Sequence, residues 1–273
     1  MEYYSTMKIL MPRLKSDRHD FETHLKYATL IADLSAKLKI TSNLQPKLSR
    51  VDAEKLKDKI KLVKLTKVSI DQEYEIVSID GDYSTAAVLW LPTKTYYLIY
   101  HLLCIVECLL TGKKEMLSAG HHECINEFTR KLKNMEIVFN EPLFNSVFDA
   151  GILDFKTKSG EILKSNISEN VLYPLLMKKL VKGKIENYKI VQNLSASKTK
   201  DKVRINSFKS KISVSVFDFF HLMRLRTTYR DLDFVDNIPS RDTKLYFEKY
   251  RTSADNFYKC FARYINELLK ECS

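Results

Sequence analysis

Glycine and proline are scarce in this sequence, with six of each among 273 residues. This composition excludes collagen-like and low-complexity chains. It also argues against nucleotide-binding folds that depend on several glycine turns. The G-x-G-x-x-G fingerprint is absent, and Gly112-Lys113-Lys114-Glu115 lacks both the upstream glycine and the Ser or Thr of a Walker loop.

Long apolar runs are also missing. The most apolar segment, residues 96–110, contains His101 and Glu107, and a membrane-spanning helix needs about 20 apolar residues. The N-terminus shows no basic run followed by an apolar stretch, which argues against a signal peptide. The five cysteines are an odd number without the spacing of a disulfide framework. We therefore expect a cytoplasmic protein with no membrane partner.

Positive charge is what the chain has in excess, with 45 Lys and Arg against 34 Asp and Glu and a net charge of +11. Residues 178–211 contain 11 bases and two acids, so this segment alone has a balance of +9. An anionic partner is expected, and Tyr188 or Phe208 within the basic segment favours nucleic acid because aromatic rings stack on bases. The alternative is a solvated, lysine-rich hairpin. The expected phosphate contacts are Lys198, Lys200, Lys202, Arg204, Lys209, Lys211, Arg224 and Arg230.

Hydrophobic periodicity predicts a mostly α-helical fold. Apolar residues recur at steps of three and four, as in amphipathic helices. Gly112 and Gly183 are expected to end the helices before them. The predicted helices cover about 18–40, 52–64, 95–110, 120–133, 168–183, 216–229 and 242–269.

Strands are predicted in three regions. Residues 74–79 are rich in β-formers and precede the turn signal Asp80-Gly81. Residues 137–165 have a β-rich pattern, and 188–191 and 203–208 alternate apolar and polar residues around a polar loop.

Two segments separated in the chain resemble the two halves of a HEPN domain. Residues 95–128 combine an aromatic-rich apolar helix, a Gly-Lys turn, a His-His pair and a second helix that reaches a phenylalanine. Residues 223–234, Met-Arg-Leu-Arg-Thr-Thr-Tyr-Arg-Asp-Leu-Asp-Phe, precede the long helix 242–269. The family is a commonly dimeric, antiparallel four-helix bundle. Many members are metal-independent ribonucleases of toxin–antitoxin and phage-defence systems, and inactive members bind RNA or proteins.

The resemblance implies a division of the chain into three parts. Residues 93–136 and 212–273 would form a HEPN-like antiparallel helical bundle. Residues 1–92 would be an N-terminal helical extension with a short β-hairpin, and residues 137–211 a β-rich, basic insertion.

The ribonuclease motif of that family is an arginine followed after four to six residues by a histidine. Arg226 matches the arginine, but the histidine positions hold Asp231, Leu232 and Asp233, and no histidine follows His221. An ordinary carboxylate has a pKa near 4 and cannot replace an imidazole without a large shift. We therefore expect an RNA-interacting protein of the defence or toxin–antitoxin type that lacks the catalytic histidine.

Two alternatives stay open. One is a metal-independent endoribonuclease in which Arg226 acts with Asp231, Asp233 or His121, with Tyr229 in the same cluster. The other is a non-enzymatic protein–protein module, a scaffold or an antitoxin, whose homodimer face is helix 95–110.

A metal site is a weaker interpretation. His101, Cys104 and Cys108 share one helical face, and His121, His122 and Cys124 follow. These residues lack the paired spacing of zinc ligands, and cysteine on an apolar helix is usually a core residue. We expect no metal and no cofactor.

Overall fold

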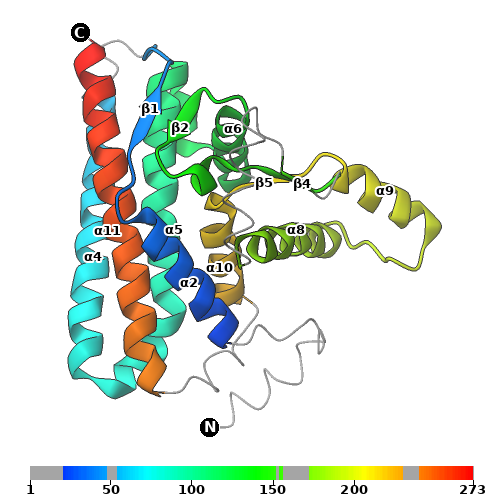
Figure 1. Ribbon diagram of the computed structural model, residues 1–273, viewed down its shortest axis with the longest axis horizontal. Helices are drawn as coiled ribbons and strands as arrows, with labels where there is room; N and C mark the ends of the chain where they lie inside the picture. The colour runs from blue at the N-terminus through cyan, green and yellow to red at the C-terminus, as the bar shows by residue number, and fades with distance from the viewer. Residues whose placement is uncertain (1–20, 48–53, 152–153, 156–171, 230–239, 273) are drawn as a thin grey trace.

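The computed structural model describes residues 21–47, 54–151, 154–155, 172–229 and 240–272 (Figure 1). Its main body is a bundle of long helices, which confirms the mostly α-helical class. The helices of this bundle are α2 (Phe21–Ser35), α4 (Lys57–Ile79), α5 (Gly81–Thr111), α10 (Phe217–Tyr229) and α11 (Ser240–Glu271).

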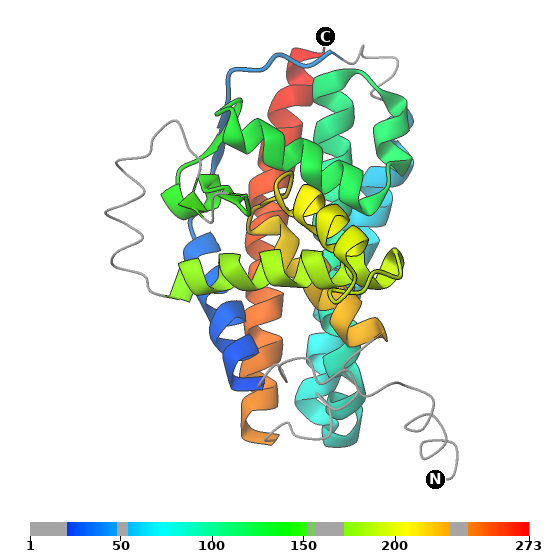
Figure 2. The ribbon, with the colours of Figure 1, turned by 90° about the vertical axis from the view of Figure 1, so that its right-hand side faces the viewer.

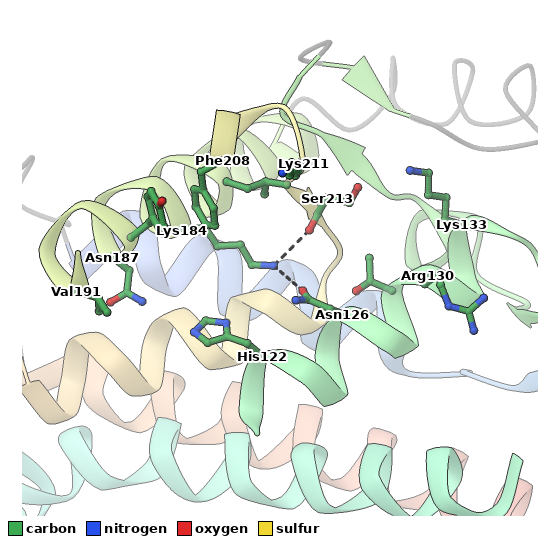
Figure 3. A pocket seen from close by; sticks show the side chains of 13 residues that line it. His122, Asn126, Arg130, Lys133, Lys184, Asn187, Val191, Phe208, Lys211 and Ser213 are labelled. Carbon is green, nitrogen blue, oxygen red and sulfur yellow. Dashed lines mark hydrogen bonds between the residues drawn. The ribbon is translucent and has the colours of Figure 1, made fainter. Parts of the chain in front are cut away.

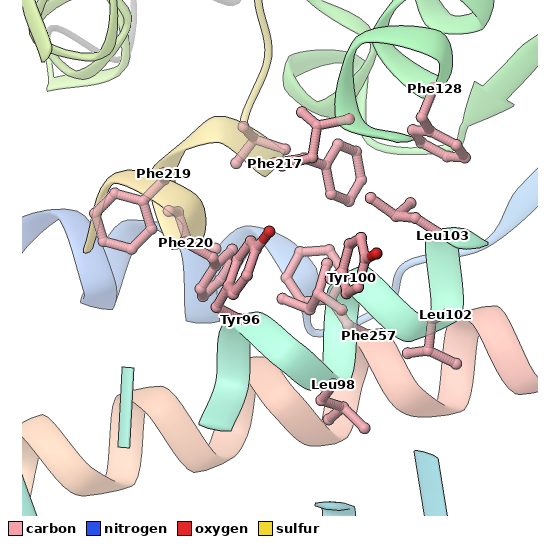
Figure 4. Packing of buried hydrophobic residues seen from close by; sticks show 14 of the residues in the cluster. Tyr96, Leu98, Tyr100, Leu102, Leu103, Phe128, Phe217, Phe219, Phe220 and Phe257 are labelled. Carbon is pink, nitrogen blue, oxygen red and sulfur yellow. The ribbon is translucent and has the colours of Figure 1, made fainter. Parts of the chain in front are cut away.

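Helix α5 lies at the centre of the bundle because it is apolar on every side. Its second half packs against α4, α10, α11 and α6 (His121–Lys133). Tyr96, Leu98, Leu103 and Cys108 are all almost fully buried, and Figure 4 shows α5 side chains meeting phenylalanines of α6, α10 and α11. The expected dimer face on helix 95–110 is therefore wrong, because this helix supplies the core and has little surface to offer a partner.

The two segments that resemble HEPN halves pack together. Helix α5 contacts α10 and α11, and α6 contacts α10. Helix α4 also packs along α5, and the boundary expected between residues 92 and 93 falls inside α5. The N-terminal part of the chain thus shares its core with the segments that follow.

The strand predicted at residues 74–79, and the short β-hairpin expected there, are wrong. The chain there ends α4 and begins α5, and Asp80 alone separates the two helices. Asp80 is extended (φ −115°, ψ 109°), and its carboxylate accepts a hydrogen bond from the Tyr83 amide at 3.0 Å. This side chain therefore caps the start of α5. Tyr74 and Val77 pack against the core from a helical backbone, so burial outweighs their β-propensity.

Short strands close one side of the bundle. β1 (Ile40–Ser42) and β2 (Ile137–Phe139) pair antiparallel, with Thr41 opposite Val138. β3 (Phe148–Asp149) lies between β4 (Asp154–Phe155) and β5 (Ser213–Val214). Single 3₁₀ turns cover η1 (Glu54–Leu56), η2 (Lys114–Ser118) and η3 (Pro142–Asn145).

The basic segment forms a helical arm, which corrects the expectation of a β-rich insertion at 137–211. Helices α8 (Leu172–Val191) and α9 (Thr199–Lys209) occupy the positions of both predicted strands. The strands described in this region have only two or three residues each. The arm projects from the bundle in Figure 1, and α8 crosses the long helices at a steep angle in Figure 2.

Two glycines have different roles from one another. Gly112 adopts φ +71° directly after α5, and its amide donates to the Cys108 carbonyl, so the predicted helix stop is confirmed. Gly183 does not end a helix, because α8 continues to Val191. A Cβ atom at Gly183 would lie 2.7 Å from a methyl group of Leu222. The missing side chain therefore lets α8 approach α10 closely.

Candidate functional site

The residues expected to contact the phosphates of a nucleic acid lie mainly on the arm. Lys200, Lys202, Arg204 and Lys209 belong to α9, Lys198 precedes its first turn, and Lys211 follows its end. Lys198, Lys200, Lys202 and Arg204 are exposed. The structure thus brings these bases together on one short helix and its flanks.

A pocket of about 520 Å³ lies where the arm meets the bundle (Figure 3). It is formed by α6, α8, the end of α9 and β5. Four bases line it and, among the described residues, no carboxylate does. Besides the four bases, the lining includes one histidine and two aromatic rings. These residues are Arg130, Lys133, Lys184, Lys211, His122, Tyr188 and Phe208.

An aromatic pair forms one wall of the pocket. The rings of Tyr188 and Phe208 stack with their centroids 3.8 Å apart and their planes at 10°. Tyr188 comes from α8 and Phe208 from α9, so this stack joins the two helices of the arm. Its flat apolar surface lies beside the four bases, and flat rings next to cationic side chains are the elements that bind nucleotides.

The most enclosed base is Lys184. Its ammonium group pairs with the Asp218 carboxylate at 2.7 Å and donates to the Asn126 side chain at 3.4 Å and the Ser213 carbonyl at 3.3 Å. Asp218 in turn accepts from the Ser215 amide at 2.8 Å, at the start of α10. These contacts hold Lys184 in place across α6, α8 and α10, and the Asp218 carboxylate compensates its charge.

The other bases are freer. Arg130 pairs with Glu127 and Glu136 at 3.2 Å each, and Lys133 lies 4.0 Å from Asp149. All these carboxylates lie outside the lining of the pocket. Lys211 is exposed, and within the described part of the chain no ion pair is found for it. Both it and Lys133 can therefore turn toward an anion.

A second polar cluster adjoins the pocket through His122. The His122 ring meets the His221 ring edge-on at 4.6 Å between centroids. His121 Nδ1 lies 2.6 Å from the Tyr96 hydroxyl, and the Arg224 guanidinium lies over the Tyr96 ring at 5.5 Å. The cluster thus joins α5, α6 and α10, and it holds three imidazoles and one guanidinium around Tyr96.

The imidazoles are neutral at neutral pH. Burial lowers the pKa of His122, helped by the nearby charge of Lys184. Burial also puts the pKa of His221 far below its ordinary range, and it lowers that of His121, where Arg224 adds to the effect. A neutral imidazole can accept a proton, and a guanidinium can stabilise a negative charge, so this cluster contains groups that can act in acid–base chemistry.

Several expected residues lie where side chains are not described. Arg226 and Tyr229 are on α10 by their backbone positions, but their side chains lie outside the described part of the structure. Arg230, Asp231 and Asp233 lie outside the described residues altogether. Their assignment as site residues therefore stays a prediction.

The cysteines on the helical face considered as a weaker metal interpretation lie in the core. Cys104 and Cys108 are buried, and the Cys104 thiol lies 3.5 Å from that of Cys124. Within the described residues, no group of three His, Cys, Asp or Glu side chains is arranged to hold a metal ion.

Sequence reasoning missed the pocket residues of α6 and α8. Arg130 and Lys133 are three residues apart on the polar face of a strongly amphipathic helix, which is a local signal for a basic patch. Lys184 belongs to the basic segment but was not distinguished from its neighbours by any pattern. Only the fold places these three side chains beside Lys211.

No helix in the described part of the chain is long and apolar enough to span a bilayer. Comparison of the chain with known protein families, with curated proteins and with solved structures finds no match.

Proposed function

We propose that this protein binds single-stranded nucleic acid in the arm pocket and along the exposed side of α9. The observation that carries the proposal is the lining of the pocket, where four bases and a stacked aromatic pair meet without a carboxylate. A volume of about 520 Å³ falls within the range of about 300–1,000 Å³ typical of ligand pockets.

The charge continues beyond the pocket, which favours a polymer over a small anion. Lys198, Lys200, Lys202 and Arg204 are exposed on α9 and its first flank. A backbone that leaves the pocket at Lys211 could follow the side of α9 that carries Arg204 and Lys200, four residues apart, and each contact would release a counterion. Lys202 lies on the other side of the helix. The resemblance to HEPN domains favours RNA over DNA and a role in defence or in a toxin–antitoxin pair.

Fluorescence anisotropy of a labelled single-stranded RNA, titrated at several salt concentrations, tests the proposal. The variant K198E/K200E/K202E is expected to lose most affinity and to flatten the salt dependence, since each lost phosphate contact reduces the log–log slope by about 0.7. A matched control, K244E/K259E/R263E, changes the net charge equally on exposed positions of α11, across the bundle from the arm. Its affinity should fall much less.

Two results would contradict RNA binding at the arm. One is no binding of RNA at low salt. The other is an equal loss of affinity in both triple variants, which would mean that only net charge matters. Parallel titrations with single-stranded DNA of the same sequence show whether RNA is preferred, because the 2′-hydroxyl is the group that differs.

Metal-independent RNA cleavage is a second candidate function, and the cluster around Tyr96 favours it. His121 would take the proton of a 2′-hydroxyl, whose oxygen would bond to the adjacent phosphorus as the P–O5′ bond breaks, leaving a 2′,3′-cyclic phosphate. The leaving 5′-oxygen would take a proton from protonated His121 or from water, and Arg224, 5.5 Å from the centre of the Tyr96 ring, would stabilise the phosphate. Cleavage of RNA in EDTA, lost in H121A and R224A, is the expected result. Arg226→Ala is tested in parallel because its side chain lies outside the described part of the structure. Cleavage that persists in all three variants would exclude this chemistry.

A further inference from the structure

Helix α4 carries apolar side chains on its outer face. Leu65 is 57% exposed and Ile79 is 88% exposed, although both are large aliphatic residues. The members of this outer stripe recur at steps of three and four and follow one side of the helix, with a polar interval at Ser69 and Gln72. They are Leu62, Leu65, Val68, Ile76 and Ile79.

The charges of the same helix are divided between its two halves. Residues 57–68 contain five lysines and one aspartate, whereas residues 69–80 contain four acids and no base. Most of the acids have partners within the chain: Asp71 pairs with Lys67 and Arg251, Glu73 is buried against Lys94, and Asp80 caps α5. Lys61, Lys64 and Glu75 are exposed, and no ion pair is found for them in the described part of the structure.

We propose that the outer stripe of α4 is a homodimer interface in which two copies of α4 pack antiparallel about a two-fold axis. The antiparallel arrangement places the exposed Lys64 of each copy near the exposed Glu75 of the other. It also places Leu62 and Leu65 of one copy against Ile76 and Ile79 of the second. A parallel arrangement would set like charges side by side, which is unfavourable.

A second copy of this chain fits the stripe better than other partners do. The exposed Lys64 and Glu75 lie at similar distances on either side of the middle of the apolar stripe, near residue 70. A surface that is complementary to itself when turned by 180° is the requirement for an isologous two-fold dimer. Nucleic acid would be repelled by the acidic half, including the exposed Glu75.

The position of α4 leaves the arm open in such a dimer. Helix α4 lies along one edge of the bundle, and the arm projects from the opposite side (Figure 1). The helix has 23 residues and is about 34 Å long, so the two copies can contact each other over several turns. The dimer does not depend on RNA binding, and the two proposals can fail separately.

Sedimentation velocity of the full chain over a range of concentrations tests the interface. We expect a species of twice the chain mass of 31.9 kDa. The variant L65E/I76E should be a monomer, because it buries two pairs of carboxylates in the interface. The control L175E replaces a leucine of similar exposure on α8 and should stay dimeric. Circular dichroism verifies that all the variants are folded.

A charge exchange tests the antiparallel arrangement. K64E alone and E75K alone should each weaken the dimer about tenfold, because the two-fold axis repeats every lost contact. The double variant K64E/E75K restores opposite charges and should regain most of that loss. Three results would overturn the proposal: a monomer at every concentration, a dimer unaffected by L65E/I76E, or a double variant no tighter than the single ones.

Discussion

The buried ion pair between Glu107 and Lys131 offers the sharpest test of the packing in the bundle. Glu107 lies on α5 and Lys131 on α6, and their side chains are 0% and 3% exposed. Burial raises the pKa of Glu107, and the ammonium group of Lys131 opposes that rise. Replacing Lys131 with methionine keeps the apolar stem but leaves a carboxylate buried without its counter-charge.

The cost of K131M follows from leaving the Glu107 carboxylate buried without its counter-charge. Removing one partner of a buried pair typically costs about 3–5 kcal/mol. The full cost is expected at a pH above the raised pKa of Glu107, where the carboxyl group is ionised. Since Glu107 protonates more readily in the folded state, the stability of K131M should fall as the pH rises from about 4.3 through the raised pKa.

Urea unfolding of K131M and of the wild type at several pH values between 5 and 8 measures this loss. The difference between the two proteins should be small at pH 5 and reach about 4 kcal/mol near pH 8. The double variant E107Q/K131M should recover much of the loss at high pH because its glutamine carries no charge. A difference that is the same at every pH, or a double variant as unstable as K131M, would refute this explanation.

Three further predictions follow from single contacts. His221 is buried with a depressed pKa, so the unfolded chain takes up its proton first, and stability falls by up to about 1.4 kcal/mol per pH unit below pH 6.5. H221N should reduce that slope in urea unfolding at pH 5 to 7. Gly112→Ala should lower the unfolding free energy by about 1–2 kcal/mol at any pH, because φ is +71°. Phe208→Ala should weaken RNA binding by about 1–3 kcal/mol in anisotropy titrations, through loss of the stacked wall. Each prediction has its own contradicting result. The pH slope of H221N could equal the wild-type slope, the stability of Gly112→Ala could be unchanged, or the RNA affinity of Phe208→Ala could be unchanged.

Local patterns predict best where a helix has one clear apolar face. Helices α6 and α11 begin and end within two residues of the predicted ranges, and Gly112 ends α5 as expected. These features depend on neighbours in the sequence: side chains three and four residues apart, and a glycine that tolerates a positive φ.

The wrong predictions fall where β-formers lie on a helix with exposed positions. Ile76 and Ile79 favour a strand by composition, yet they are exposed on α4, whose opposite face packs on α5 and α11. Residues 188–191 and 203–208 alternate like strands, but the Tyr188–Phe208 stack joins two helices there. Local alternation over four to six residues cannot separate the two structures, because tertiary packing decides between them.

The sequence by itself determined that the protein is mostly helical and that its excess positive charge is concentrated in residues 178–211. Composition and short-range periodicity are enough for both. Only the tertiary structure decided where the candidate sites lie. The pocket takes Lys133 from α6, Lys184 from α8 and Lys211 from the end of α9. The cluster around Tyr96 takes its histidines from α6 and α10. Such groupings depend on how helices distant in the chain pack around α5, and no spacing along the sequence encodes them.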